Sequence, residues 1–162
     1  MSQKTVAAIL DRFRELGIAA RISTHPPVRT SEEAAAIRGV PLSSGVKALV
    51  CKTKEGSFIL LLVKGDEKAD LKRLDRLEGA KKLTLASPEE VLQLTDCEPG
   101  ADPPFGFAPP LKTYFDPRIR EAATAPSGAR TGTVNFNIGL QTHSATIAEQ
   151  DLEKALGAFV EY

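Results

Sequence analysis

The sequence predicts a single α+β domain, residues 1–162, with a central mixed, mostly antiparallel sheet flanked by helices. The first observation is a β-hairpin signal: residues 46–52 and 58–64 are apolar runs separated by a polar turn that contains a glycine. The second is a set of capped amphipathic helices on both sides of that hairpin. The third is a length and a hydrophobic share of 42%, which suffice for one substantial core.

The hairpin contains one residue that does not fit its pattern. Residues 58–63 are apolar without interruption, so both faces of this strand are expected to be covered. Lys47 lies between Val46 and Ala48, inside the apolar pattern of the first strand. A lysine there either extends its ammonium group to water or is kept for its charge. Spacing alone favours the first interpretation, because lysine is rarely fully buried.

The N-terminal part predicts two helices and a short strand, at residues 6–16, 31–38 and 18–24. Gly17 stops the first helix, and the prolines after His25 end the strand. Thr30 and Glu33 have the spacing of a capping box for the second helix, which ends at Gly39.

The C-terminal part predicts further elements from caps, prolines and alternation, at residues 71–78, 82–85, 88–94, 111–115, 117–122, 131–138 and 149–156. In the helix at 71–78, Leu71, Leu74 and Leu77 are expected to point inward. In the strand at 131–138, Asn135 and Asn137 share one face. Asparagine is depleted in strands, so these amides either face water or line a pocket.

Residues 98–110 change the character of the chain, with five prolines and two glycines. Phe105 and Phe107 can anchor this segment, so a stiff, shaped loop is expected. Such a loop can direct backbone groups at a ligand.

Charge and cysteine usage limit the function classes. Lys plus Arg and Asp plus Glu are 21 each, so any nucleic-acid contact must come from a local patch. The basic residues between 64 and 82 alternate with acids, which favours a solvated helix face over such a patch. Cys51 and Cys97 are interpreted as free core thiols, which suits a cytoplasmic protein. The sequence contains no secretion signal and no stretch long enough to cross a membrane.

No cofactor motif is present: the chain has no GxGxxG, P-loop or HExxH. A histidine-based metal site would need both His25 and His143 together with carboxylates, so no metal and no cofactor are expected.

Short motifs spread over the chain resemble one known family. They are His25-Pro26-Pro27 with Thr30 and Glu32-Glu33-Ala34-Ala35, Gly45-Val46-Lys47-Ala48-Leu49, Gly65-Asp66, Ala86-Ser87-Pro88-Glu89-Glu90-Val91, Gly100-Ala101-Asp102-Pro103-Pro104-Phe105-Gly106, Asn135-Phe136-Asn137-Ile138-Gly139 and the region of Ser144. Each is weak alone, but their order is that of the YbaK-like family. These are free-standing aminoacyl-tRNA deacylases related to the editing domain inserted in bacterial prolyl-tRNA synthetase.

The resemblance implies a fold, an activity and a set of site residues. The family's functional lysine corresponds to Lys47, which reverses the interpretation from spacing, and its GxxxP loop corresponds to Gly100 and Pro104. The implied reaction is hydrolysis of the ester between a wrong amino acid and the terminal ribose of a tRNA. The residues then expected to bind substrate are His25, Thr30, Gly100, Asp102, Pro104, Phe105, Gly106, Asn135, Asn137 and His143.

The implied chemistry suits this inventory. An aminoacyl ester is already activated, so hydrolysis needs a placed water, a clamp and donors for the oxyanion. The resemblance implies that Lys47 holds the substrate while a ribose hydroxyl of the tRNA helps to activate the water. By spacing, no serine or cysteine has a histidine base, so a covalent mechanism is the weaker alternative.

Two other functions stay open at this point. The first is a non-catalytic tRNA-binding or synthetase-associated module, against which the retention of Lys47 and of the Gly100 to Pro104 pattern argues. The second is a protease or esterase, for which no triad is recognisable.

Substrate identity and partners follow only from the resemblance. Family members act on alanyl, cysteinyl, seryl or threonyl esters, and a small residue, Ala or Ser/Thr, is expected here, with tRNA-Pro as a candidate carrier. The expected partners are the aminoacylated tRNA end and an aminoacyl-tRNA synthetase, and the protein is expected to be a monomer or weak dimer.

Overall fold

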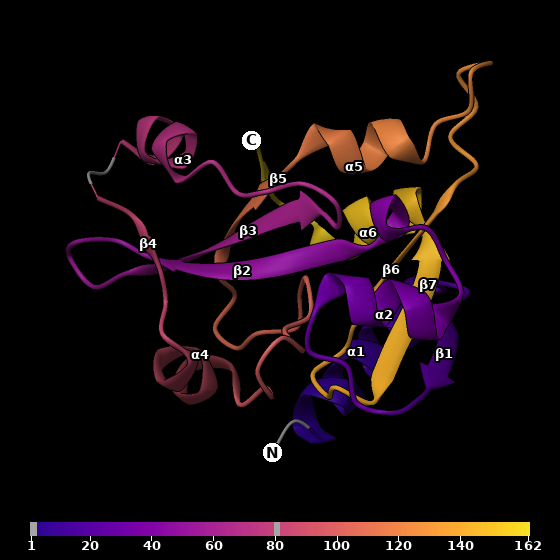
Figure 1. Cartoon of the computed structure of the whole chain (residues 1–162), viewed down its shortest axis with the longest axis horizontal. Helices are drawn as coiled ribbons and strands as arrows, with labels where there is room; N and C mark the ends of the chain where they lie inside the picture. Colours follow the sequence, from indigo (N-terminus) through magenta and orange to yellow (C-terminus); the bar gives the residue numbers. More distant parts are fainter. Residues whose placement is uncertain (1–2, 80–81) are drawn as a thin grey trace.

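The predicted hairpin is the longest feature of the fold. A computed structural model describes residues 3–79 and 82–162 of the chain. In it, β2 (Val46–Lys52) and β3 (Phe58–Lys64) pair antiparallel along their whole length, from Val46 opposite Lys64 to Lys52 opposite Phe58. Figure 1 shows this hairpin running across the molecule, with α3 and α4 on opposite sides near its turn.

The strands divide between two sheets. The hairpin is joined by β4 (Thr84–Leu85), β5 (Lys112–Phe115) and β8 (Val160–Glu161) in a mixed sheet of five strands. The strand order is β4-β2-β3-β5-β8. In this sheet β5 runs parallel to both of its neighbours, β3 and β8. The other sheet is antiparallel, in the order β1 (Arg21–Thr24), β7 (His143–Ala148) and β6 (Thr133–Asn137). A parallel bridge between Gly45 and Asn135 links the two sheets. The α+β class with mixed, mostly antiparallel strands is therefore confirmed.

The helices lie where the capping and periodicity signals predict them. They are α1 (Gln3–Leu16), α2 (Ser31–Arg38), α3 (Leu71–Glu78), α4 (Pro88–Thr95), α5 (Pro117–Ala122) and α6 (Glu149–Leu156). A 3-10 turn that was not predicted, η1 (Leu42–Ser44), lies between α2 and β2. The hydroxyl of Thr30 accepts from Glu33 N at 3.1 Å, as expected of the N-cap of α2. The Glu33 carboxylate, however, accepts from Arg29 N at 2.9 Å and not from Thr30 N, so this capping box is only half formed.

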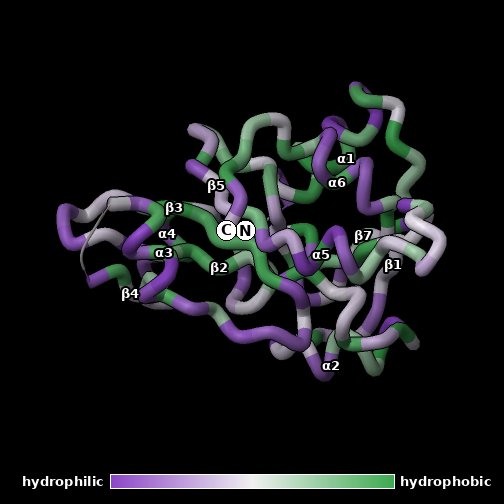
Figure 2. The backbone as a smooth tube through the Cα atoms, turned by 90° about the horizontal axis from the view of Figure 1, so that it is seen from above, coloured by the Kyte–Doolittle hydropathy of each residue, from purple (hydrophilic) through white to green (hydrophobic). Residues whose placement is uncertain are grey.

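Both faces of β3 are covered, which explains its unbroken apolar run (Figure 2). Leu60 and Leu62 face a large core that contains residues of α1, α6, β6 and β7. Ile59, Leu61 and Val63 face a smaller cluster closed by α3 and by two buried tyrosines, Tyr114 and Tyr162. The alternation of side chains along a strand thus divides one apolar run between two cores.

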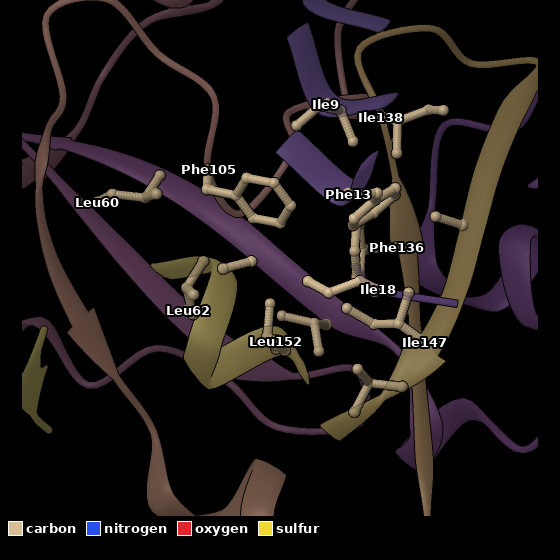
Figure 3. Close-up of a cluster of buried hydrophobic side chains, with 14 of the residues drawn as sticks. Ile9, Phe13, Ile18, Leu60, Leu62, Phe105, Phe136, Ile138, Ile147 and Leu152 are labelled. Atoms are coloured by element: carbon tan, nitrogen blue, oxygen red, sulfur yellow. The ribbon is translucent and has the colours of Figure 1, made fainter. Parts of the chain in front are cut away.

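Phe105 fixes the proline-rich loop onto the larger core. Its ring makes edge contacts with Phe13 of α1 and Phe136 of β6, at centroid distances of 5.8 and 6.1 Å. Figure 3 shows this ring among the side chains of Ile9, Leu60 and Leu62. The contacts of Phe105 with the larger core therefore fix the conformation of the loop at residues 98–110, as its composition predicts.

Two features differ from the sequence-based expectation. Strand β7 was not expected, because residues 143–148 are mostly small or polar; its pairing with both β1 and β6 forms it. Leu77 was expected to point inward but is 45% exposed, because α3 lies at the margin of the smaller core and buries only Leu74.

In the described part of the chain, no helix combines the length and the apolarity that crossing a bilayer requires.

Candidate active site

A cavity of about 170 Å³ opens where the two sheets meet. Four segments line it: residues 29–38 around the start and face of α2, residues 42–49 from η1 to β2, the beginning of the loop at 98–110, and one face of β6. Figure 1 shows α2 lying beside β6 and the adjoining end of β2. The cavity brings together six of the residues expected to form the site, namely Thr30, Lys47, Gly100, Asp102, Asn135 and Asn137.

Lys47 enters the cavity from the start of β2. Side chains alternate along the strand, so Val46 and Val50 point into the larger core while Lys47 points to the opposite face. Its Nζ donates to the carbonyl oxygen of Glu67 at 2.6 Å. An ammonium group has three donors, so two remain for a ligand. The lysine side chain is half-buried, and its hydrogen bond to Glu67 holds it in place. Among the described residues it forms no ion pair with a carboxylate.

The asparagine face of β6 lines the cavity and is tied to the helix α2. Arg38, the last residue of α2, donates from its two terminal nitrogens to Asn135 Oδ1 at 2.8 Å and to Asn137 Oδ1 at 2.7 Å. Its Nε donates to Ser144 Oγ on β7 at 2.8 Å. One planar guanidinium thus fixes three neutral oxygens of two strands, which matches its fork geometry.

Arg38 is a cation whose described partners are all neutral. Burial lowers the pKa of its guanidinium to about 10, still far above neutral pH. The residue stays charged. The three hydrogen bonds above use three of its five N–H groups and leave two. It lines the cavity beside the asparagines and so contributes a positive field there. The sequence signal was weak: an arginine in the last turn of a helix is ordinary.

The guanidinium should also stabilise the junction of the sheets. Arg38→Gln removes the guanidinium hydrogen bonds to Asn135 Oδ1 and Ser144 Oγ, both on residues that are 2% exposed. We expect a loss of about 2 kcal/mol in the free energy of unfolding, measured by urea denaturation. Arg76→Gln, on an exposed arginine of α3, is the matched control and should change it by less than about 0.5 kcal/mol. Equal effects of the two changes would contradict this role.

The loop enters the site at Gly100. Its φ of +76° lies in the left-handed region, and a Cβ added there would meet the carbonyl oxygen of Arg29 at 2.5 Å. Asn137 Nδ2 donates to the carbonyl oxygen of Gly100 at 2.8 Å. A side chain at this position therefore cannot be accommodated without moving either the loop or the segment before α2.

Asp102 follows two residues later in the same loop. Its Oδ1 accepts from the Thr95 hydroxyl at 3.2 Å. Burial raises the pKa of the carboxyl group to about 6, and the Thr95 hydrogen bond lowers it by less. The group is thus ionised at neutral pH, at a cost to stability.

That cost has a defined pH dependence. Because the folded state holds the proton more tightly than the unfolded state, this group favours folding at low pH, and the benefit is lost as pH rises through about 6. Asp102→Asn, which keeps the acceptor for Thr95, should therefore raise the free energy of unfolding by about 1–3 kcal/mol at about pH 7.5. The gain should shrink toward zero at about pH 4.5. Urea denaturation at the two pH values checks this, and a gain that is the same at both would contradict it.

The other five expected residues lie outside this cavity. Pro104, Phe105 and Gly106 line a second, larger cavity of about 740 Å³ between the loop, α1 and the end of α6. His143 Nδ1 lies 2.8 Å from the hydroxyl of its neighbour Thr142. His25 contacts the site only through Ser144, with its Nε2 2.7 Å from Ser144 Oγ.

The pair of His25 and Ser144 corrects one expectation. Spacing gave no serine a histidine base, yet strand pairing of β1 with β7 brings these two side chains into hydrogen-bond distance. The serine is 2% exposed, does not line the cavity, and accepts from Arg38. A buried hydroxyl in that position supports the site and is poorly placed to attack a substrate. Among the described residues, no cluster of three or more His, Cys, Asp or Glu could hold a metal ion.

A family model described as the aminoacyl-tRNA editing domain matches residues 25–155 of the chain. The chain belongs to this family. The match covers all four segments that line the cavity. It confirms the family and the editing class of activity expected from the sequence motifs.

Individual relatives agree with this assignment. The chain is 38% identical over 134 residues to the multifunctional Ser/Thr-tRNA deacylase ProXp-y of Escherichia coli (strain K12), covering 81% of this chain and 75% of that protein. It is 32% identical over 127 residues to the proline–tRNA ligase of Bacillus licheniformis, covering 76% of this chain but 22% of the ligase. The crystal structure of a candidate trans-editing enzyme for prolyl-tRNA synthetase superposes with a TM-score of 0.78 at 28% identity, covering 96% of this chain and 94% of that one.

Proposed function

We propose that this editing domain, residues 1–162, hydrolyses the ester bond between a small, wrongly attached amino acid and the terminal ribose of a tRNA. The observation that carries the proposal is the cavity in which Lys47, the Gly100 loop and the asparagine face of β6 converge. The chain's membership of the editing-domain family and its similarity to a Ser/Thr-tRNA deacylase support the same activity.

Lys47 is the proposed clamp on the substrate. The hydrogen bond to the Glu67 carbonyl fixes the position of Nζ, and two N–H groups stay available for the ester carbonyl or the terminal nucleotide. A held cation stabilises the oxyanion that develops when water attacks, and it needs little rearrangement to do so. The attacking water is activated with help from the ribose hydroxyl of the substrate, since the described lining residues include no histidine.

The amino acid removed is proposed to be Ala, Ser or Thr. The cavity is small, at about 170 Å³. Such a pocket excludes large side chains more strongly than it separates small ones, because one methylene changes binding by only about 1–3 kcal/mol. The partner is the aminoacylated end of a tRNA, with tRNA-Pro as the first candidate, and the protein acts as a monomer or weak dimer in the cytoplasm beside a synthetase.

A panel of mischarged tRNAs tests this proposal. The purified chain is incubated with Ala-, Ser-, Thr-, Cys- and Leu-charged tRNA-Pro, and ester release is followed under single-turnover conditions. We expect release from at least one of the Ala, Ser and Thr esters and none above buffer from the Leu ester. Preferential release of the large residue would contradict the assignment of the pocket.

Deacylation is expected to need no metal ion bound to the protein. The described residues offer no ligand cluster, and the ester is reactive enough without a Lewis acid. Extensive treatment with a chelator, followed by removal of the chelator and restoration of the magnesium that the tRNA fold requires, should leave the rate unchanged. A rate that falls and then recovers only when zinc is added would disprove this expectation.

A further inference from the structure

The cavity has walls of opposite charge. Arg29, Arg38 and Lys47 line it from the N-terminal half of the chain. Asp102 lines it from the loop, and it is the one carboxylate among the described lining residues. A substrate with both signs of charge would therefore be oriented on entering.

The Asp102 carboxylate is underused by the protein itself. Among the described residues its side chain has a single hydrogen-bond donor, the Thr95 hydroxyl at 3.2 Å, and it forms no ion pair with a lysine, arginine or histidine. An ionised carboxylate can accept about four hydrogen bonds. Burial without a counter-ion is unfavourable, which the raised pKa of the group reflects. A neutral side chain would serve the fold better at this position.

The backbone on both sides of Asp102 is fixed. Ala101 is fully buried, and its carbonyl oxygen accepts from Gly139 N at 2.9 Å. Pro103 and Pro104 follow, both buried, and restrict the chain further. Asp102 therefore lines the cavity from a rigid segment, which lowers the entropy lost when a ligand binds.

We propose that Asp102 binds the free α-ammonium group of the aminoacyl ester, an assignment that rests on the function proposed above. The tRNA end carries only negative charge on its phosphates, and the α-ammonium is the positive group nearest to the scissile carbonyl. The arginines then face the nucleotide, Lys47 faces the scissile carbonyl, and Asp102 faces the amino acid. An ester whose amine is acylated, as in peptidyl-tRNA, has no cation for Asp102 and leaves the carboxylate unpaired.

The test compares one tRNA charged with serine and the same tRNA after N-acetylation. For the wild type, kcat/KM should be at least about 10-fold higher for the free amine, the size expected for a charge-assisted hydrogen bond. Asp102→Asn keeps the acceptor for Thr95 and should lower kcat/KM for the free amine by about the same factor. It should leave the N-acetyl substrate almost unchanged, so the preference disappears. The control Glu121→Gln removes an exposed carboxylate on α5 and should keep the wild-type preference for the free amine.

Two outcomes would overturn the assignment. If Asp102→Asn slows both substrates equally, the residue only supports the fold or the chemistry; if it slows neither, it has no part in binding. A second measurement is independent of hydrolysis: calorimetric binding of 3′-serylamino-3′-deoxyadenosine, a stable amide, with its amine free or acetylated. Tighter binding of the free amine by the wild type but not by Asp102→Asn supports the assignment, and equal binding of both forms overturns it. Tighter binding of the free-amine amide, together with no ester release from seryl-tRNA in the first measurement, would instead refute the proposed deacylase function alone.

Discussion

Lys47→Ala is expected to lower the single-turnover rate of ester release by about 100-fold or more, the effect typical of losing a preorganised oxyanion donor. The Nζ atom is held by the Glu67 carbonyl at 2.6 Å, and Lys47 is one of the residues that line the cavity. No other lysine lines the cavity among the described residues.

The fold should survive this change. Lys47 contributes one hydrogen bond and no described ion pair, and its removal takes a half-buried charge out of β2. We expect the melting temperature to stay within about 3 °C of the wild type or to rise. Lys68→Ala, on an exposed lysine, is the matched control and should alter only the salt dependence of tRNA use. A folded Lys47→Ala protein with near-normal rates would refute the role of this lysine.

Gly100→Ala is expected to have the second largest effect, a fall in deacylation rate of about 10- to 100-fold. The new Cβ would lie 2.5 Å from the carbonyl oxygen of Arg29, so the loop and the segment before α2 must separate. That separation displaces Asp102 from the cavity and weakens the hydrogen bond from Asn137 to the Gly100 carbonyl. The bulkier Gly100→Val should lower the rate further, and both should lower the rate by a larger factor than they lower the folding equilibrium.

Gly128→Ala separates backbone strain from displacement of the loop. Gly128 also has a positive φ, +88°, but no atom lies within 4 Å of its Cβ position. Both substitutions carry the left-handed penalty of about 1–2 kcal/mol, and only Gly100→Ala forces the loop away from Arg29. Thermal melts beside single-turnover rates for both variants provide the measurement. Full activity in Gly100→Ala would mean that the loop is only scaffold and that Lys47 and the asparagines form the pocket without it.

The sequence predicts best those elements whose causes are local. The hairpin follows from two apolar runs around a glycine turn, and α2 and α4 begin at the capping residues Thr30 and Ser87. Strand β7 was missed because its residues gain strand structure only from partners far along the chain. Leu77 was misplaced for a related reason: a helical period shows which residues share a face but not how far that face is covered.

The candidate site was predicted unevenly for the same reason. Motifs pointed to Lys47, Gly100 and the asparagines of β6, and the fold brings them to one cavity. Arg38 gave no local signal, because its three acceptors lie 97, 99 and 106 residues away in the chain. The site residues of the loop, from Gly100 to Gly106, were all expected to bind substrate, whereas Gly100 and Asp102 line one cavity and Pro104 to Gly106 line another. A contiguous motif can thus serve two places, since consecutive residues point in different directions.

The most direct test of the account is ester release from a mischarged tRNA by the purified chain alone, with no synthetase present. The substrate is seryl-tRNA-Pro labelled on the amino acid, with enzyme in excess, and Lys47→Ala is measured in parallel. The account predicts release well above the buffer rate for the wild type and a rate at least about 100-fold lower for the variant. Tight binding of the charged tRNA with release no faster than in buffer would contradict it, and would make the chain a binding module on the editing fold.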